Sequence, residues 1–328
     1  MTAERNIMEQ VLAGAERIHK TPKKTPVQDG VLLVCGDSLT PQPIAWLWPY
    51  WLALGKLVIL AGAPGTGKTT IALSFAATVT TGTTWPDGSR CEPGNVLIWS
   101  GEDDPADTLL PRLLAAGADR SRVFFVSGTQ IDGQVQPFDP ARDMPALLAA
   151  AERIGTVRLI VLDPVVSAIA GDSHKNAEVR RDLQPLVDLA ASMNAALLGI
   201  THFSKGGQGI DPAQRVLGSV AFTAVARVVL VAAKVRSEDG EDRRILARAK
   251  SNIGPDDGGM TYALEQCEPL PGINASRVSW GAAVQGSARE LLTDPSEQDG
   301  EGESSRSEAA EFLPEVLADG PVPSKEVQ

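Results

Sequence analysis

The sequence has few cysteines and no long apolar run. Its 328 residues include three cysteines, Cys35, Cys91 and Cys267, and none of them belongs to a CxxC pair. Scattered thiols favour a reducing cytoplasm and argue against a structural zinc site. No run of roughly 18 apolar residues occurs, so no membrane span is expected, and the charged, amphipathic start lacks a secretory apolar region. We therefore expect a cytoplasmic protein that does not act at a membrane.

Basic residues are also fewer than acidic ones. The chain has 30 Lys and Arg against 41 Asp and Glu, a net charge of -11, and such a balance argues against nucleic-acid binding. From Gly281 to the end, however, eleven acidic residues stand against three basic ones, which gives that segment -8 and leaves -3 for the rest. The acidity is mostly a property of the tail, so basic loops remain compatible with the preceding chain.

Composition divides the chain into four expected parts. Residues 1–40 are expected to be an N-terminal extension and linker, and residues 41–282 the folded core. Residues 283–306 are rich in Gly, Ser, Asp and Glu, which predicts an acidic flexible linker. Residues 307–328 hold a helix candidate and a turn, too short to bury a core of their own.

Four aromatic residues lie close together where the core begins: Trp46, Trp48, Tyr50 and Trp51. They have two interpretations. One is a surface on which nucleic-acid bases stack, and the other is an apolar lead-in that packs on the core or on a neighbouring subunit. We favour packing, because that is what aromatic side chains mostly do.

Apolar strands alternate with amphipathic helices through the middle of the chain. The expected strands are 57–60, 95–100, 123–126, 157–162 and 195–200, and the expected helices are 67–79, 105–116, 146–154 and 176–193. This alternation predicts a parallel sheet covered on both faces. Expected strands over 224–233, 244–250 and 260–264 follow without intervening helices. The fold class is therefore α/β, a mainly parallel sheet with helices on both faces and an antiparallel C-terminal extension.

One segment has the full GxxxxGK(S/T) pattern of a P-loop. Its residues, with the one that follows, are Gly62, Ala63, Pro64, Gly65, Thr66, Gly67, Lys68, Thr69 and Thr70. A strand is expected before it and a helix after it, which makes a chance Gly-rich turn a poor explanation. The backbone N–H groups and the helix N-terminus would hold the phosphates of ATP. Lys68 would contact the β and γ phosphates, and the Thr69 hydroxyl would bind Mg²⁺.

Two carboxylates follow expected strands. Asp163 ends an apolar strand, where it would meet Mg²⁺ through the water shell of the ion; a helix N-cap is the alternative. Glu102 follows the strand 95–100, and a carboxylate there can orient and deprotonate the attacking water. Asp103 is the second candidate for this base, and capping of the helix near Pro105 is the structural alternative.

Together these motifs resemble the RecA/DnaB branch of P-loop ATPases, and within it the hexameric plasmid-replication helicases of the RepA type with their phage and mobile-element relatives. The resemblance extends from about Leu57 to Asn252 and implies a RecA-like core. Its more specific parts are Ser100-Gly-Glu-Asp103, Ile200-Thr-His-Phe-Ser-Lys205, and Arg215-Val-Leu-Gly-Ser219 followed by Ala226-Arg227.

The resemblance implies roles at single positions. Glu102 would be the catalytic base, and His202 would sense the γ-phosphate, although the family usually has His-His where this chain has Thr201-His202. Arg227 would be an arginine finger that reaches the ATP of the next subunit. Its structural alternative is a surface arginine. Lys250 would lie near the same intersubunit phosphate, and Arg112 would stack on adenine.

The function implied is an ATP-hydrolysing ring, hexameric in the relatives, that acts on single-stranded DNA as a helicase or translocase, with a replication initiator or primase as a further partner. Loops 168–176 and 204–215 would face the DNA. Lys175, Arg180, Arg181 and Lys205 would contact its phosphates or be ordinary solvated charges. Two alternatives stay open: a recombination or repair ATPase that forms filaments, and a nucleotide-dependent replication scaffold that does not unwind. The tail after 306 resembles the start of a winged helix.

Overall fold

The computed structural model describes residues 31, 33–169, 176–202, 220–236 and 242–292. The chain divides into two units, residues 1–43 and 44–328. In the described part of the first unit the structure has a 3-10 turn, η1 (Gly36–Ser38). The expected DNA-facing loop 204–215, most of the loop 168–176, and the tail 307–328 lie outside the described residues. No described helix is long and apolar enough to cross a membrane.

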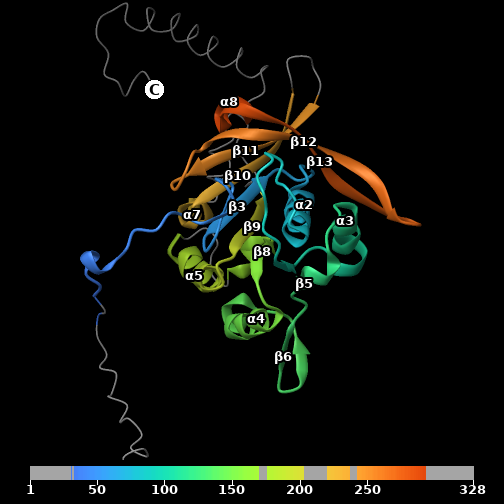
Figure 1. Cartoon of the computed structure of the whole chain (residues 1–328). Helices are drawn as coiled ribbons and strands as arrows, with labels where there is room; N and C mark the ends of the chain where they lie inside the picture. Colours follow the sequence, from blue (N-terminus) through green and yellow to red (C-terminus); the bar gives the residue numbers. More distant parts are fainter. Residues whose placement is uncertain (1–30, 32, 170–175, 203–219, 237–241, 293–328) are drawn as a thin grey trace, which may run out of the picture. The chain divides into compact units, whose positions relative to one another are not determined.

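A nine-stranded sheet forms the centre of the second unit (Figure 1). Its strands are β3 (Leu57–Gly62), β4 (Asn95–Ser100), β5 (Val123–Phe125), β8 (Val157–Asp163), β9 (Ala196–His202), β10 (Val228–Arg236), β11 (Asp242–Ser251), β12 (Asp257–Leu270) and β13 (Ile273–Ser287). Their order is β13-β12-β11-β10-β3-β9-β8-β4-β5. Neighbours from β10 to β5 pair in parallel, and those from β10 to β13 pair antiparallel. The predicted fold class is thereby confirmed.

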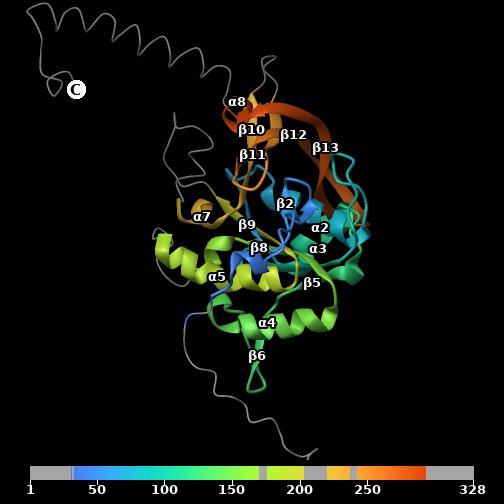
Figure 2. The same ribbon diagram turned by 60° about the vertical axis from the view of Figure 1, so that its left-hand side comes forward.

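Helices cover both faces of this sheet (Figures 1 and 2). They are α2 (Lys68–Thr81), α3 (Leu110–Ala115), α4 (Pro140–Ile154), α5 (Asn176–Ser192), α7 (Val220–Val225) and α8 (Ala288–Leu292). Shorter elements are the turns η2 (Pro105–Leu109), η3 (Arg120–Arg122) and η4 (Val165–Ala168), and the small hairpins β1 (Trp46–Trp48) with β2 (Leu52–Ala53) and β6 (Thr129–Ile131) with β7 (Gln134–Gln136). Buried side chains of α4, α5, α7 and α8 pack on one face, and those of α2, α3 and β1–β2 on the other.

The central strand β3 shows why these sequences are apolar throughout. Leu57 and Ile59 are buried in the core on the α5 side, whereas Val58 and Leu60 are buried in the core on the α2 side. Successive side chains of a strand point to opposite faces, so a strand covered on both faces needs an apolar residue at every position. The same requirement explains the apolar runs of β8 and β9, whose ends carry the polar residues of the site.

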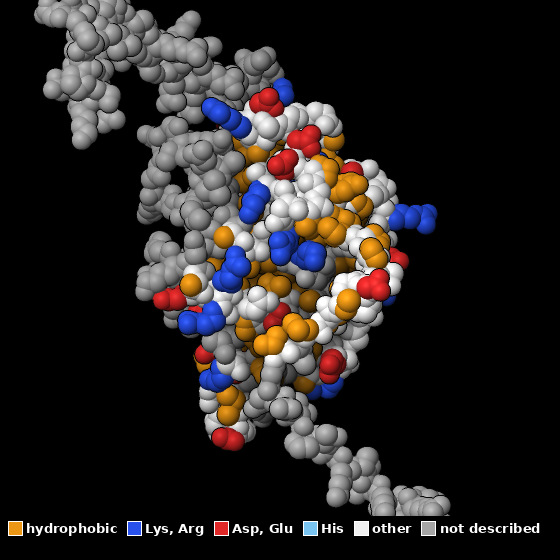
Figure 3. Space-filling view, turned by 90° about the vertical axis from the view of Figure 1, so that its left-hand side faces the viewer, with side chains coloured by type: hydrophobic (Ala, Val, Ile, Leu, Met, Phe, Trp, Pro, Cys, Tyr) orange, Lys and Arg blue, Asp and Glu red, His pale blue; other side chains and the backbone are white. Residues whose placement is uncertain are grey.

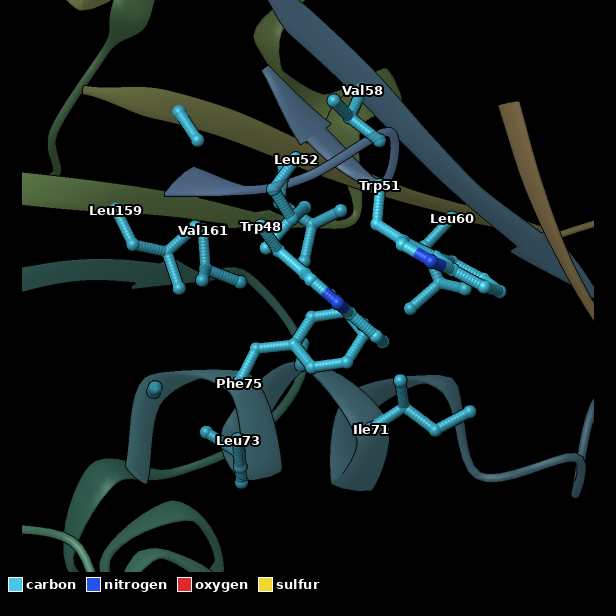
Figure 4. Packing of buried hydrophobic residues seen from close by; sticks show 14 of the residues in the cluster. Trp48, Trp51, Leu52, Val58, Leu60, Ile71, Leu73, Phe75, Leu159 and Val161 are labelled. Carbon is cyan, nitrogen blue, oxygen red and sulfur yellow. The ribbon is translucent and has the colours of Figure 1, made fainter. Parts of the chain in front are cut away.

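The aromatic residues near position 48 are part of the core (Figure 4). The Trp48 side chain is 0% exposed. It stacks on Trp85 and Trp51, with ring centroids 4.9 and 4.7 Å apart, and its Nε1 donates to Asp87 Oδ2 at 2.9 Å. Phe75 of α2 meets it edge-on. The packing interpretation is confirmed for Trp48 and Trp51, while Tyr50 is 47% exposed.

The C-terminal part of the sheet extends further than the sequence predicted. Residues 283–292, assigned above to an acidic linker, form the end of β13 and helix α8. β12 is also longer than the expected strand over 260–264. β13 pairs with β12 along most of its length, and this pairing stabilises a Gly-, Ser- and Ala-rich segment with a weak strand pattern of its own. The sequence Pro271-Gly272 between the two strands is a turn signal that would have indicated a hairpin.

Two further boundaries differ from expectation. The predicted strand over 224–233 begins inside α7, and β10 starts only at Val228. Phe222 of α7 is buried in the same core as the apolar residues of α5. Its carbonyl accepts the N–H of Ala226 at 3.0 Å, as in a helical turn, so the helix continues almost to the start of β10. Helix α4 begins at Pro140 instead of residue 146. β10 pairs in parallel with β3, so the antiparallel extension starts with β11.

Candidate active site

The P-loop connects β3 to α2 at the C-terminal edge of the parallel strands. Gly65 and Gly67 have φ of 78° and 88°, a left-handed conformation that glycine adopts without strain. Gly62 needs to be glycine for another reason, because a Cβ there would lie 2.3 Å from the Ala232 carbonyl oxygen. The exposed residues 63–65 present their backbone to solvent, while Thr66 and Lys68 are buried. This geometry explains the small residues of the motif.

Lys68 is held at the centre of the site. Its Nζ donates to the carbonyl oxygens of Gly62 and Ala63 at 3.0 and 3.1 Å, and it lies 3.1 Å from His202 Nδ1. Burial lowers the pKa of Lys68, and the charges of Asp163 and Glu102 partly oppose this shift. Buried cations are stabilised by anions, so the side chain is suited to a phosphate at the mouth of the loop.

Thr69, in the first turn of α2, meets Asp163, the last residue of β8. The Thr69 hydroxyl donates to Asp163 Oδ2 at 2.6 Å, and Asp163 is 5% exposed. Burial raises the pKa of Asp163, the nearby charges of Glu102 and Asp103 raise it further, and the hydrogen bond from Thr69 and the charge of Lys68 oppose these effects. A cation would remove the cost of this buried negative charge.

This pair of oxygens fits Mg²⁺. A hydroxyl and a carboxylate are the hard oxygen ligands that Mg²⁺ prefers, and the ion usually keeps waters and binds phosphate besides one or two protein groups. Within the described residues no group of three or more His, Cys, Asp and Glu side chains is arranged to hold a metal. The site thus suits an ion shared with a nucleotide, and does not provide a complete protein cage.

The first three acidic residues after β4, Glu102, Asp103 and Asp104, have different surroundings. The Asp103 carboxylate pairs with Arg112 at 3.3 Å. Glu102 is exposed, and its charge acts on both Lys68 and Asp163. Capping of the following turn, the structural alternative for Glu102, falls to Asp104, whose side chain accepts the N–H of Ala106 at 2.7 Å. Glu102 is therefore the carboxylate in this segment without a structural partner among the described residues.

His202 and Arg112 lie at the same edge of the sheet. His202 ends β9 directly beside Gly62 of β3, and its ring is exposed instead of being packed in the core. The contact of its Nδ1 with Lys68 links the end of β9 to the P-loop. Arg112, on α3, is bound to Asp103. The structure thus brings together Lys68, Thr69, Asp163 and His202, with Glu102 within electrostatic reach.

Arg227 and Lys250 lie at the opposite edge. The N–H of Arg227 donates to the carbonyl of Leu57, the first residue of β3, at 3.0 Å. Lys250 pairs with Val229 near the start of β10. With about 3.3 Å per strand residue, the six residues of β3 separate Arg227 from the P-loop of its own chain by roughly 17 Å. The exposed Arg227 side chain is therefore remote from the Lys68 of the same chain.

Tyr262 of β12 was not expected at this site. Tyr262 is 5% exposed, and its hydroxyl donates to the Thr66 carbonyl of the P-loop at 2.6 Å. On the adjacent strand, Trp280 Nε1 donates to Ser74 Oγ of α2 at 3.0 Å. The hairpin β12–β13 therefore packs against the P-loop and the helix behind it. No local sequence pattern connects residues 196 positions apart, so this contact could not be predicted.

Comparison with known proteins identifies the family. No curated protein matches this chain. A family of AAA domains, AAA_25, matches residues 21–208, which is more than half of the chain. The matched segment contains the P-loop, Glu102, Asp163 and His202, and it ends before Arg227. The chain belongs to this family of AAA domains and is a P-loop ATPase.

Proposed function

We propose that this ATPase is one subunit of a ring-shaped motor, with six subunits, that moves along single-stranded DNA as a helicase or translocase. The observation that carries the proposal is the position of Arg227. The P-loop, Thr69 and Asp163 occupy one edge of the sheet, whereas Arg227 occupies the other, roughly 17 Å away along β3. The residues of one site are split between two edges of the molecule.

An arginine that neutralises charge in phosphoryl transfer contributes about 10³–10⁵ in rate. Arg227 cannot supply this to the ATP on its own chain, so a neighbouring copy has to present its Arg227 edge to the P-loop edge. Such a head-to-tail contact repeats, and it generates a closed ring or a helical filament. Oligomerisation then becomes part of the active site.

Each residue of the P-loop edge has a role in this proposal. The backbone of residues 62–67 and Lys68 hold the phosphates, and Thr69 with Asp163 holds Mg²⁺, which neutralises charge on the β and γ phosphates when bound. Glu102 accepts the proton of the attacking water. His202 contacts Lys68, and it passes the state of the γ-phosphate to the segment that follows β9.

Support for DNA comes from the motif order, because residues 100–103 and 200–205 resemble those of ring helicases that act on single strands. Support for a closed ring comes from the same resemblance. Arg112 as an adenine contact and a replication initiator or primase as partner rest on the resemblance alone, and they stay predictions.

The test measures ATP turnover with and without a single-stranded oligonucleotide, strand displacement, and the mass of the assembly with ATP. We expect stimulation by the oligonucleotide, a closed ring, and loss of all turnover in Glu102→Gln, which still binds ATP. Lys68→Ala is expected to lose nucleotide binding. A monomer whose hydrolysis ignores the oligonucleotide would overturn the proposal. Filaments in electron micrographs would favour a recombination ATPase, and turnover without displacement would favour a scaffold.

A further inference from the structure

A small pocket lies beside Arg227 at the N-terminal edge of the sheet. Its volume is about 240 Å³. Its polar lining consists of Lys56, Arg180, Gln184 and Arg227, and Leu57 is among the apolar residues that line it. Pockets that enclose a whole small molecule typically measure about 300–1,000 Å³. This pocket is smaller, so it suits a single charged group at the end of a larger ligand.

The pocket collects positive charge. Lys56, Arg180 and Arg227 line it, and no described lining residue is acidic. None of the three forms an ion pair with a described residue, in contrast to Arg112, Arg158 and Arg277, which each pair with a carboxylate. Figure 3 shows Lys and Arg side chains gathered near the middle of the side of the molecule that carries α5 and α7. Cations confined together repel one another, and a bound anion removes that cost.

Arg227 is fixed from several directions. Its N–H donates to the Leu57 carbonyl at 3.0 Å, and its carbonyl accepts the N–H of Asn252 at 3.2 Å. The side-chain amide of Asn252 satisfies two groups of Arg227 when its nitrogen faces the Arg227 carbonyl. In that orientation the nitrogen donates to the carbonyl at 3.0 Å, and the oxygen accepts from Arg227 Nη1 at 3.2 Å. A guanidinium has five N–H donors, so one bond to Asn252 orients the group and leaves donors for a ligand.

We propose that this pocket binds the terminal phosphate of the ATP held by a neighbouring copy. Lys56 and Arg180 are then two additional phosphate contacts beside Arg227, and Asn252 is a residue that positions Arg227. The ligand is a phosphate because its several charged oxygens match both a planar guanidinium, which binds two of them, and a compact ammonium. The inference rests on the proposed function in one respect, the contact of one copy's P-loop edge with this edge of the next.

The first test measures steady-state ATP turnover of Lys56→Ala and Arg180→Ala. Each is expected to lower kcat by at least about tenfold, with a smaller effect on KM, because the contacts strengthen as charge develops on the transferred phosphoryl group. The control is Arg153→Ala, which removes an exposed arginine of α4; its kcat should equal that of the wild type. Unchanged kcat in both pocket variants would overturn the proposal.

The second test asks whose phosphate is bound. Lys56→Ala subunits are mixed with Glu102→Gln subunits, so that an intact P-loop edge meets an intact pocket in part of the assemblies. We expect turnover to recover well above the level of either variant alone. If turnover does not recover in the mixture, Lys56 acts on the ATP of its own chain, which contradicts the proposal.

A nucleic-acid phosphate is the competing ligand. To separate the two sources, binding of a fluorescent single-stranded oligonucleotide is measured in Glu102→Gln and in Glu102→Gln with Lys56→Ala, both with ATP. Equal affinities support the ATP phosphate. Weaker oligonucleotide binding together with normal turnover of Lys56→Ala would assign the pocket to nucleic acid and overturn the inference.

The positioning role of Asn252 has its own readout. Asn252→Ala should lower kcat in the wild-type background and cause no further loss in an Arg227→Ala background, because it acts through Arg227. A further loss there would show an independent role. These outcomes distinguish the inference from the proposed function. If the pocket variants stay active while Arg227→Ala is inactive, the inference about the pocket is wrong and the proposed motor function stands. If wild-type turnover does not respond to DNA, the proposed motor function is wrong.

Discussion

At the scale of single residues, the site stores two buried charges of opposite sign. Lys68 and Asp163 are both 5% exposed. Burial is the largest influence on each, and it lowers the pKa of Lys68 and raises the pKa of Asp163. Both shifts favour the neutral forms, so the mutual attraction of the two side chains does not compensate for the water they have lost. Binding of a phosphate beside Lys68 and of a cation beside Asp163 would offset this cost.

Asp163→Asn tests this cost. The folded-state pKa of Asp163 lies above the unfolded value of about 3.9, so its contribution to stability is most favourable below that pH and is lost as pH rises through the folded pKa. At pH 7 the nucleotide-free variant should melt at a higher temperature than the wild type, because the amide oxygen still accepts the Thr69 hydroxyl. The difference should shrink as pH approaches 4.

Thermal melts at both pH values check this, with ATP turnover measured in parallel. The variant is expected to lose Mg²⁺-dependent hydrolysis and the stabilisation that Mg²⁺ with ATP gives the wild type. A lower melting temperature at pH 7 in the absence of nucleotide would contradict the assignment of Asp163 as a destabilising buried charge.

At the scale of secondary-structure elements, the small hairpin β1–β2 is anchored by one side chain. Trp48 is fully buried and stacks on Trp51 and Trp85. It also contacts Phe75 of α2 edge-on (Figure 4). Trp48→Ala should reduce the free energy of unfolding by about 3–5 kcal/mol, the usual cost of truncating a buried aromatic residue. The measurement is urea denaturation followed by circular dichroism.

Tyr50 supplies the matched control, since it belongs to the same hairpin and is 47% exposed. Tyr50→Ala should cost about 1 kcal/mol, because the ring of Tyr50 contacts only Trp46 among the described aromatic side chains, with centroids 5.5 Å apart. Equal costs for the two variants would show that burial at position 48 is not what holds the hairpin to the core.

The hairpin β12–β13 acts on the P-loop through Tyr262. Tyr262→Phe removes the donor to the Thr66 carbonyl, and an unsatisfied buried carbonyl costs about 1–3 kcal/mol. We expect lower stability in urea and weaker ATP binding by calorimetry, since the loop loses one of its anchors. Tyr50→Phe changes the other tyrosine of the chain and should alter neither quantity. Unchanged ATP affinity in Tyr262→Phe would mean that the loop keeps its shape without the hairpin.

The structural features that were predicted from the sequence involve residues close together in the chain, whereas those that were missed involve residues far apart in it. The P-loop was predictable because strand, loop and helix are contiguous, and Asp163 because an apolar strand leads directly to it. Tyr262 was not, because its partner Thr66 lies 196 positions away. β13 was missed because its stability comes from β12 instead of its own pattern. Arg227 was named by resemblance, while its remoteness from the P-loop follows only from the parallel register of β3 and β10.

At the scale of the whole molecule, the two edges of the sheet predict complementation between defective copies. Arg227→Ala subunits have an intact P-loop edge, and Glu102→Gln subunits have an intact Arg227 edge. Neither should turn over ATP alone, whereas a mixture should regain a measurable fraction of wild-type turnover. The experiment uses equal total protein at several mixing ratios, and mass measurement verifies that mixed assemblies form. Mixed assemblies that remain inactive would disprove a site shared between copies.

One strand joins the two edges. The Leu57 carbonyl at one end of β3 holds Arg227, and the Gly62 carbonyl at the other end holds Lys68. β3 is flanked by β9 and β10 and is buried on both faces, and close-packed interiors transmit strain. In the proposed closed assembly, each β3 would connect one triphosphate site to the next, so a displacement at one catalytic centre would reach its neighbour without a hinge. ATP hydrolysis at successive sites of the ring would then be coupled mechanically through the six buried residues of β3.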